Sequence, residues 1–379
     1  MKLFVVGMVL GSGLGYKAKP RQKQYTQPEY PRLGNKLAFQ DDFSKLDMNK
    51  WHPEITAGGG GNWEFQFYNN DRRTSFVEDN VLYIKPMLTM DYLGMDKDKF
   101  LKEGALNLWG NAPGMQCTAN AFYGCERSTQ GDNIVNPIMS AQLRTVDSFN
   151  FKYGRVEIEA KMPRGDWIWP AIWLMPKHHA YGGWPASGEI DIVESRGNLD
   201  NCHGDGVSTV SSALHWGTHW SKSMYNLTSG KITSDGTDFS RKFTKFTLEW
   251  TQERIRTLAD GKVIMDVHFD EPLFKRGKYS KTEFNPWANS EKSRNNAPFD
   301  EEFYLILNVA VGGVNGFFPD TPGVRGVRHQ EALEEHRRKR LQELLQRQRP
   351  MAQDMERRKR PSLFSNGDQE RQSLHQLIP

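Results

Sequence analysis

An antiparallel β-sandwich is the fold that this 379-residue sequence predicts. Many short segments alternate apolar and polar residues with period two, as strands do when one face is buried. Turn residues separate these segments at regular intervals, for example Asp260-Gly261 before the apolar run 263–269. No amphipathic helices alternate with the strands, which argues against a parallel sheet of βαβ units. A single large β domain of this length is common.

The N-terminal residues 1–15 are interpreted as a secretory signal peptide. Lys2 precedes an apolar run, 3–10, and small residues follow it. The run is too short to span a membrane. The alternative, an N-terminal core strand, has no amphipathic pattern in its favour. Residues 16–32 place three prolines among polar residues and predict an extended linker.

The body of the domain begins near Leu33, and its first notable feature is a four-glycine loop at 58–61. We expect a strand over 62–68 with a polar face and an apolar face. A polar row suits sugar hydroxyls, although a solvated sheet face has the same pattern. The polar face would carry Asn62, Glu64, Gln66 and Tyr68, and the apolar face Trp63, Phe65 and Phe67.

Residues 88–135 form a long insertion without clear periodicity, of the kind that borders a site or is stapled. Cys117 and Cys125 enclose a short loop within it and are predicted to form a disulfide. A disulfide agrees with secretion, because such bonds persist in oxidising compartments. Cys202 is then left over.

The middle of the chain is rich in strands and tryptophan. Residues 153–162 alternate cleanly, and 166–176 contains Trp167, Trp169 and Trp173, of which one or two are expected at a site and the others in the core. Trp184 follows, just before three carboxylates, so its ring is close enough to them to stack on a sugar bound there. Further strands are expected at 81–86, 140–144, 210–217, 243–250, 255–258, 263–269 and 303–311.

Three carboxylates within six residues dominate the stretch 184–198. Alternation places Glu189 and Asp191 on one face of a strand, with isoleucines on the other. Strict alternation would turn Glu194 away, but one extra residue in a β-bulge would bring it to the same face. A solvated face is the structural alternative, but the run contains no Lys or Arg to balance the acids.

Paired carboxylates are what glycoside hydrolysis requires. One attacks the anomeric carbon and the other protonates the leaving oxygen, at a separation of about 5 Å in retaining enzymes. A third acid between them can hold a proton and keep the outer two in different protonation states.

The run Glu-Ile-Asp-Ile-Val-Glu-Ser-Arg-Gly-Asn at 189–198 resembles the signature of glycoside hydrolase family 16, in the bulged version of its laminarinases. Stretches at 58–68, 153–176, 212–217 and 305–320 resemble its animal members, which are secreted β-1,3-glucanases and β-1,3-glucan-binding proteins. The resemblance covers roughly residues 33–322. It implies a concanavalin-like β-jelly roll with a substrate cleft across the concave sheet.

The resemblance also implies roles for individual residues. Glu189 would be the nucleophile and Glu194 the acid/base, while Asp191 would tune the pair and His215 would support Asp191. Asn62, Glu64, Trp167 and Trp184 are candidate substrate contacts.

Residues 325–379 differ from the family. Family members close the sandwich with a C-terminal strand rich in valine and tyrosine, whereas this segment is charge-dense and has no alternating run. It holds 13 Lys+Arg against 8 Asp+Glu, so its net charge of +5 leaves −1 for residues 1–324 out of the total of +4. The basic balance therefore gives no reason to expect nucleic-acid binding by the body. We assign 33–324 to the catalytic domain and 325–379 to a helical or disordered tail outside the sandwich.

These observations predict a secreted, extracellular endo-β-1,3-glucanase that acts with retention on laminarin-like glucans. The alternative is a β-1,3-glucan-binding recognition protein of innate immunity, a class whose members lack one or both catalytic glutamates. Hydrolysis of another β-glucan or of a galactan also stays open. We expect a monomer without cofactor or metal, with no nucleic-acid or membrane partner. Asn226 begins an Asn-Leu-Thr glycosylation sequon.

Overall fold

The computed structural model describes residues 2–5, 37–110, 112, 114–131, 133–199 and 205–318. The chain divides into two compact units, and the described residues all belong to the one made of Met1–Val9 and Lys17–Val327. The predicted tail, 325–379, and Cys202 lie outside the described residues. No helix in the described part of the chain is both long and apolar enough to cross a bilayer.

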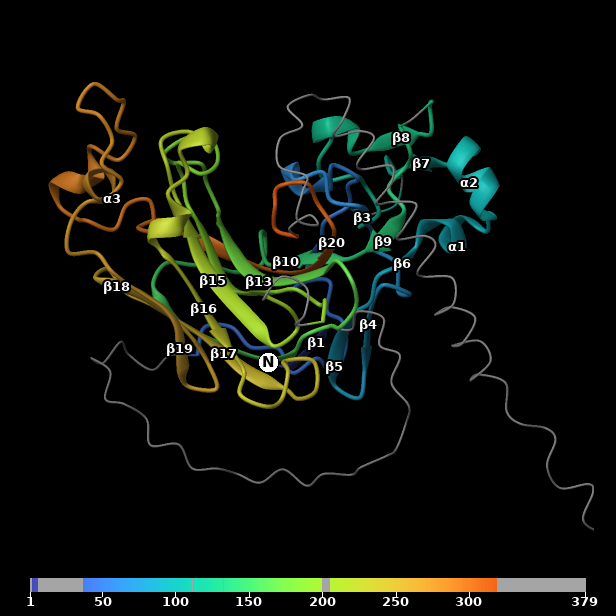
Figure 1. The fold of residues 1–379 in the computed structure, drawn as a ribbon, viewed down its shortest axis with the longest axis horizontal. Coiled ribbons are helices and arrows are strands. Elements are labelled where there is room, and N and C mark those ends of the chain that lie inside the picture. Colours follow the sequence, from blue (N-terminus) through green and yellow to red (C-terminus); the bar gives the residue numbers. More distant parts are fainter. Residues whose placement is uncertain are drawn as a thin grey trace, which may run out of the picture. The chain divides into compact units, whose positions relative to one another are not determined.

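Within the described residues, the outer layer of the fold is a seven-stranded sheet (Figure 1). Its pairs are antiparallel except for those of β1, which runs parallel to both of its neighbours. In spatial order the strands are β19 (Lys262–His268), β18 (Arg254–Ala259), β17 (Thr244–Trp250), β12 (Gly154–Lys161), β1 (Lys2–Val5), β5 (Val81–Ile84) and β4 (Ser75–Glu78).

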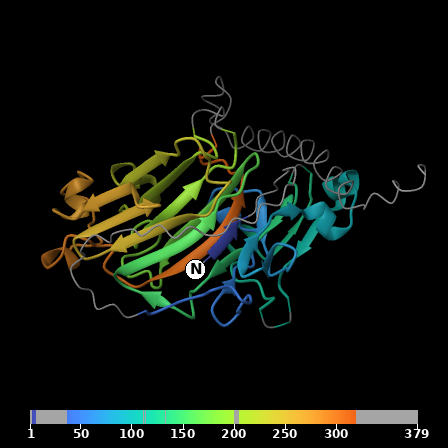
Figure 2. The ribbon, with the colours of Figure 1, turned by 90° about the horizontal axis from the view of Figure 1, so that it is seen from below.

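The second layer in the described part is an eight-stranded sheet, whose strands run in a direction similar to those of the first (Figure 2). In order it contains β16 (Ser229–Thr233), β15 (Thr209–His215), β14 (Glu189–Ser195), β13 (Ile168–Pro176), β20 (Phe303–Val311), β10 (Gln142–Arg144) and β2 (His52–Pro53), with β11 (Asn150–Phe151) paired to β20. Short helical segments α3 (Leu273–Arg276) and η5 (Ser290–Lys292) lie in the loop before β20. The predicted β-jelly-roll sandwich is confirmed.

A single apolar core fills the space between the two sheets. Alternation along β12 and β17 turns Ile158, Ala160, Phe246 and Leu248 inward, where each is at most 1% exposed. Burying a side chain as large as isoleucine, leucine or phenylalanine contributes about 1.5–3 kcal/mol. The strong apolar patterning of these strands therefore explains why the two-sheet fold could be predicted.

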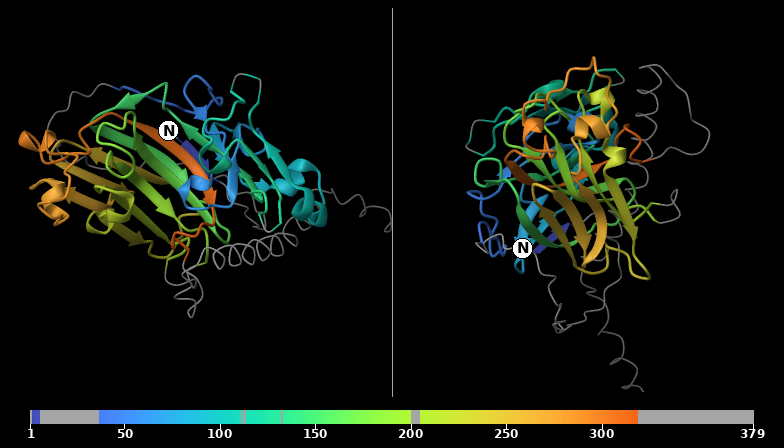
Figure 3. Two further views of the ribbon diagram at one scale, coloured as in Figure 1. Left: turned by 90° about the horizontal axis from the view of Figure 1, so that it is seen from above. Right: turned by 90° about the vertical axis from the view of Figure 1, so that its left-hand side faces the viewer.

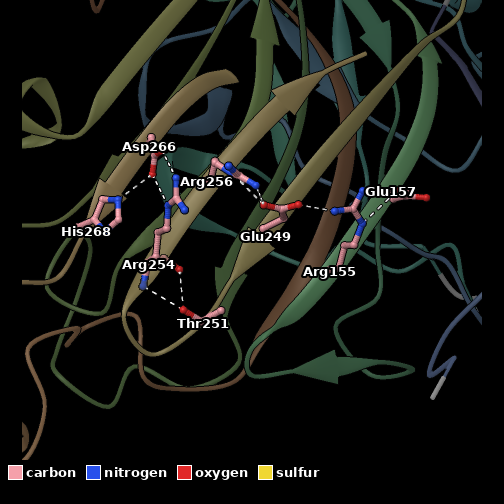
Figure 4. A network of polar contacts seen from close by, with 8 residues as sticks. All are labelled: Arg155, Glu157, Glu249, Thr251, Arg254, Arg256, Asp266 and His268. Carbon is pink, nitrogen blue, oxygen red and sulfur yellow. Dashed lines mark hydrogen bonds and ion pairs between the residues drawn. The ribbon is translucent and has the colours of Figure 1, made fainter. Parts of the chain in front are cut away.

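The opposite face of the seven-stranded sheet carries a network of charged side chains (Figure 4). It explains the polar half of the alternation on β12, β17, β18 and β19, because each acid lies beside an arginine or histidine of the same or a neighbouring strand. The network comprises Arg155 with Glu157 and Glu249, Arg256 with Glu249, and Arg254 and His268 with Asp266, while the backbone of Arg254 also donates to Thr251.

Residues 2–5 differ from the interpretation of 1–15 as a signal peptide. The structure places them as β1 between β12 and β5, with Leu3 in register with Ala160 and Leu82. An apolar run of this length is compatible with either a leader or a buried strand. Removal of a leader would leave β5 and β12 facing each other without the strand between them. The leader assignment stays a prediction.

The insertion at 88–135 is more ordered than the sequence indicates. It contains α1 (Thr89–Leu93), α2 (Lys97–Glu103), η2 (Ala121–Tyr123), and the hairpin of β7 (Ala105–Asn107) and β8 (Glu126–Ser128), at the end of the unit opposite β18 and β19 (Figure 3). Asp96 caps α2 by accepting from Lys99 N at 2.9 Å. The Cys117–Cys125 disulfide is present as predicted, with its Cα atoms 5.5 Å apart.

The strand expected at 62–68 is shorter than predicted. Strand β3 (Gln66–Tyr68) pairs with β9 (Ile138–Ser140), which pairs in turn with β6 (Met87–Leu88). Before it, the glycine loop forms the turn η1 (Gly59–Gly61), and Trp63 adopts a left-handed conformation with φ 54°. The alternation therefore breaks, and Trp63 is 42% exposed instead of joining the core.

Candidate active site

Strand β14 brings the three acids to one face of the eight-stranded sheet, which we call the site face. Asp191 and Glu194 pair with Ala213 and Ser211, so three steps along β14 match two along β15. Residues two apart on β15 share a face, and Glu194 therefore projects on the same side as Asp191. The pairing with β13 shifts in the same stretch. The bulge inferred from the sequence is thus present, and it re-aims Glu194.

Glu189 is held by a tryptophan from the preceding loop. Trp184 Nε1 donates a hydrogen bond to Glu189 Oε2 at 2.6 Å, while the indole ring remains 42% exposed. Charged acceptors make such bonds shorter and stronger than neutral ones. Trp184 thus orients the carboxylate and still presents an apolar face to a ligand.

Asp191 lies between the two glutamates and is almost fully buried. Its Oδ2 is 3.1 Å from His215 Nε2. Burial, and then the nearby Glu189 and Glu194, raise the pKa of Asp191 well above its usual range, while His215 opposes the shift. This cluster therefore retains protons at a pH where an exposed aspartate would have lost its own.

His215 lies between the rings of Tyr225 and Trp184. Its ring stacks on Tyr225 at a centroid distance of 5.1 Å and lies 5.6 Å from Trp184. Burial disfavours the imidazolium, but Glu189, Asp191 and Glu194 outweigh burial and raise the pKa of His215 to about 10. The neighbouring acids therefore favour the imidazolium form of His215, which balances their charge.

Glu194 is partly covered by an aromatic group from β13. Trp169 Nε1 donates to Glu194 Oε1 at 2.8 Å, and the Trp169 ring stacks on Phe317 with centroids 3.9 Å apart. Burial raises the pKa of Glu194, while the Trp169 hydrogen bond and His215 oppose the rise and Glu189 adds to it. A raised pKa suits a general acid, because the group must hold a proton until the leaving oxygen needs it.

Glu64 is a further acid beside this cluster. Asn62 Nδ2 donates to its Oε1 at 3.0 Å and Gln66 Nε2 to its Oε2 at 2.5 Å. Burial raises the pKa of Glu64 to about 7, against these two hydrogen bonds and with a contribution from Glu194 and Glu189. Both oxygens are thus engaged within the protein, which makes a direct substrate contact less suited to Glu64 than to the half-buried Asn62.

The structure brings the three predicted acids, His215 and Trp184 together. Trp167 precedes β13, has φ 62°, and packs against the cluster that contains Trp169. Trp169, one of the three tryptophans of which one or two were expected at a site, contacts Glu194, whereas Tyr225 is a contact that the sequence analysis missed. Trp169 lies two residues before Ala171, so the two share a face of β13, and Ala171 is in register with Glu194. The spacing of two is the part of this relation that the sequence shows. Nothing local to Tyr225 indicates its stacking on His215.

Asn226, the predicted glycosylation site, is exposed in the short turn η4 (Tyr225–Leu227), which follows η3 (Trp220–Lys222). The hydroxyl of Thr228, the third residue of the sequon, is buried and accepts from Trp216 Nε1 at 2.8 Å. A glycan on Asn226 would stand beside Tyr225 and hence beside the site. Its attachment stays a prediction.

One group of donor atoms in the described residues is compact enough to hold a metal ion. Single ligand atoms of Glu189, Asp191 and His215 all lie within 4.8 Å of one another. Two of these donor atoms already face each other, because His215 Nε2 is 3.1 Å from Asp191 Oδ2. Glu189 also accepts from Trp184. These residues suit proton transfer better than metal binding.

Replacing Glu64 with glutamine is expected to stabilise the protein more at high pH than at low pH. The pKa of Glu64 is about 7 when folded against an ordinary 4.5, so the folded state binds this proton more tightly than the unfolded state. Wild-type stability therefore falls as pH rises from about 4.5 through 7, by about 3 kcal/mol for this shift. Glu64→Gln has no such proton to lose.

The measurement is urea unfolding of both proteins at pH 5 and pH 8.5. Glu283→Gln is the control, because a hydrogen bond from Lys222 lowers the pKa of Glu283. Loss of that carboxylate should therefore not make the variant more stable than wild type as pH rises. A Glu64→Gln difference that is the same at both pH values would show that the carboxyl has an ordinary pKa.

The sequence and the site geometry both match a known family. The model for "Glycosyl hydrolases family 16" matches residues 113–300. A β-1,3-glucan-binding protein of Penaeus monodon is 46% identical over 285 residues, which cover 75% of this chain and 76% of that protein. The chain therefore belongs to glycosyl hydrolase family 16.

Two other relatives differ in length and in described activity. Glucan endo-1,3-β-glucosidase A1 of Niallia circulans is 31% identical over 74% of this chain but only 34% of its own length. The fold also matches a crystal structure of a mutant of SCLam, a non-specific endo-β-1,3(4)-glucanase that holds a 1,3-β-D-cellobiosyl-glucose. The match has a TM-score of 0.50 and 25% identity, and it covers 73% of this chain and 86% of that one. The relatives thus include both glucan-binding proteins and glucanases.

Proposed function

We propose that this protein is an endo-β-1,3-glucanase that hydrolyses laminarin-like glucans with retention of anomeric configuration. The observation that carries the proposal is the placement of Glu189 and Glu194 on one face of the bulged strand β14, each held by an indole N–H. Two carboxylates on one face of one strand, with only Asp191 between them, suit the short separation of retaining enzymes.

The first half-reaction needs a nucleophile and an acid. Glu189 attacks the anomeric carbon while Glu194 gives its proton to the glycosidic oxygen, so that the bond to the leaving sugar breaks and a glycosyl ester forms on Glu189. In the second half-reaction Glu194, now a carboxylate, takes a proton from water. The resulting hydroxide displaces Glu189 and releases a sugar with the β configuration.

Asp191 and His215 support both steps by controlling charge. Negative charge leaves Glu189 when the ester forms and appears on Glu194 when it gives up its proton. Asp191 lies between the two glutamates on β14, and His215, opposite Glu189 on β15, is 3.1 Å from it, so this pair can follow the change through its own proton.

Glucan binding without hydrolysis is the second candidate function, and the names of the relatives favour it. The Penaeus monodon relative is described as a β-1,3-glucan-binding protein. Against it stands the retention here of both glutamates, their hydrogen-bond donors and the acid between them. We further propose that the protein acts outside the cell, which the Cys117–Cys125 disulfide supports.

Incubation of the purified protein with laminarin and with a mixed-linkage β-glucan tests this proposal. We expect new reducing ends and short oligosaccharides from laminarin, and slower release from the mixed-linkage polymer. Binding to laminarin without any reducing ends would support the recognition protein. Faster cleavage of the mixed-linkage glucan would overturn the proposed specificity.

A further inference from the structure

We propose that Trp63, Phe122 and Tyr123 form an aromatic platform that binds a β-1,3-glucan chain beyond the sugars next to the scissile bond. The proposal rests on the glucan specificity proposed above and extends the site to longer ligands. All three side chains are exposed: Trp63 by 42%, Phe122 by 53% and Tyr123 by 81%. The rings of Trp63 and Phe122 are 5.7 Å apart.

The backbone of the platform is held in an unfavourable conformation. Trp63, Phe122 and Tyr123 have φ angles of 54°, 55° and 58°, in the left-handed region that bulky residues rarely adopt. Such conformations persist only where the surroundings impose them, and they gather at functional sites. Glycine or asparagine would fit these backbone positions better, so the aromatic side chains have an energetic cost that a binding role would explain.

The surroundings impose this conformation through a network between residues 54–58 and 117–125. The Cys117–Cys125 disulfide closes the loop that carries Phe122 and Tyr123. Four hydrogen bonds then fix the loop to residues 55–57: Thr118 N to Ile55 O at 2.9 Å, Ile55 N to Thr118 Oγ1 at 3.0 Å, Ala57 N to Gly124 O at 2.7 Å, and Thr56 Oγ1 to Ala119 O at 2.6 Å.

Pre-organisation of this kind has a binding advantage. A rigid loop that already presents its rings loses little conformational entropy when a ligand arrives. In Figure 1 the blue segment around η1 and the teal-green segment around η2 lie together near β8, in agreement with these bonds.

A continuous set of contacts joins the platform to Glu194. Trp63 follows Asn62, whose carbonyl accepts from Val314 N at 2.9 Å. A Cβ at Gly313 would lie 3.5 Å from Asn62 O and 3.7 Å from the Trp169 ring. Trp169 in turn donates to Glu194. The segment that carries Trp63 is thus close to the one that carries Trp169, and a glucan chain that extends from Glu194 past Asn62 would reach the platform.

A sugar chain is the occupant that fits this chemistry. The C–H faces of glucose are apolar and stack on aromatic rings, while the hydroxyl edges remain in water. Rings with 42% to 81% of their surface exposed suit such a partly solvated ligand. Each ring should contribute only to ligands long enough to reach it, so we expect the platform to select for chain length.

The test measures binding in a Glu189→Gln background, so that turnover cannot consume the ligand. Calorimetry with laminarin and with laminaritriose compares Tyr123→Ala, Tyr123→Gly and Phe122→Ala. Each ring loss should weaken laminarin binding by about 3- to 10-fold and reduce the preference for laminarin over laminaritriose. Phe284→Ala is the matched control, because Phe284 is also 81% exposed but lies in another loop.

The two Tyr123 variants separate binding from strain. Both remove the ring, but only glycine relieves the left-handed conformation, so Tyr123→Gly should melt at a higher temperature than Tyr123→Ala while binding laminarin equally weakly. Laminarin affinity within twofold of the background, or an equal loss for laminaritriose, would overturn the platform. These results are independent of hydrolysis. If the wild-type protein shows no turnover but the ring substitutions still weaken laminarin binding, only the proposed activity is refuted. If the Glu189→Gln background does not bind laminarin at all, the platform and the proposed glucan specificity are both refuted.

Discussion

Glu189→Gln is expected to reduce kcat on laminarin by about three orders of magnitude or more, with laminarin affinity within about twofold of wild type. The amide cannot form the glycosyl ester, so the double displacement stops before its first intermediate. The remaining amide oxygen can still accept from Trp184 Nε1, which keeps the indole in place for ligand binding.

The assay combines reducing-end release with calorimetry. Glu157→Gln, on the opposite face of the seven-stranded sheet, is a control that keeps the same change of charge away from the site. Residual turnover of more than a few per cent in Glu189→Gln would show that another group is the nucleophile. A parallel loss of binding would instead show that the substitution had disturbed the site.

Glu194→Gln is expected to lose activity in a way that depends on the leaving group. Hydrolysis of laminarin should fall by about 10²- to 10⁴-fold, because the departing sugar oxygen needs a proton. An activated aryl β-glycoside, whose leaving group departs as an anion, should be much less affected in its first step. The alkaline limb of the pH profile, which we attribute to loss of the Glu194 proton, should disappear as well.

Parallel kinetics of the two variants on both substrates provide the comparison. Glu189→Gln should fail equally with laminarin and the aryl glycoside, since both need the nucleophile. If the two variants respond alike to leaving-group quality, the nucleophile and acid/base roles are not divided between these residues as proposed.

The sequence predicted the centre of this site because its signals are local. Glu189, Asp191 and Glu194 lie on one strand, and the two apolar residues between Asp191 and Glu194 are one too many for strict alternation. A bulge was therefore the arrangement that brings all three acids to one face. The core strands were equally accessible, because a strand with one buried face alternates with a period of two, as β12 does from Gly154 to Lys161.

The periphery of the site could not be predicted because it depends on backbone conformations and distant contacts. Trp63 and Trp167 both adopt left-handed conformations next to glycine-containing turns, so alternation could not be extended through either residue. Tyr225 reaches His215 only because the chain returns after β15. A distant contact of that kind has no counterpart in local periodicity.

The pairing of residues 2–5 illustrates a further limit. A short apolar run carries no alternation that distinguishes a leader from a strand buried on both faces. Its position is set by pairing with β12 and β5, two strands that are distant from it along the chain.

Proton NMR of laminarin hydrolysis at early times is the most direct test of the proposed mechanism. Anomeric protons of new reducing ends are resolved before mutarotation mixes them, so the first signals report the configuration of the product. The arrangement of Glu189 and Glu194 on one bulged strand predicts that the β anomer appears first and the α anomer follows only by mutarotation. Initial appearance of the α anomer, or no new anomeric signal at all, would contradict double displacement at this site.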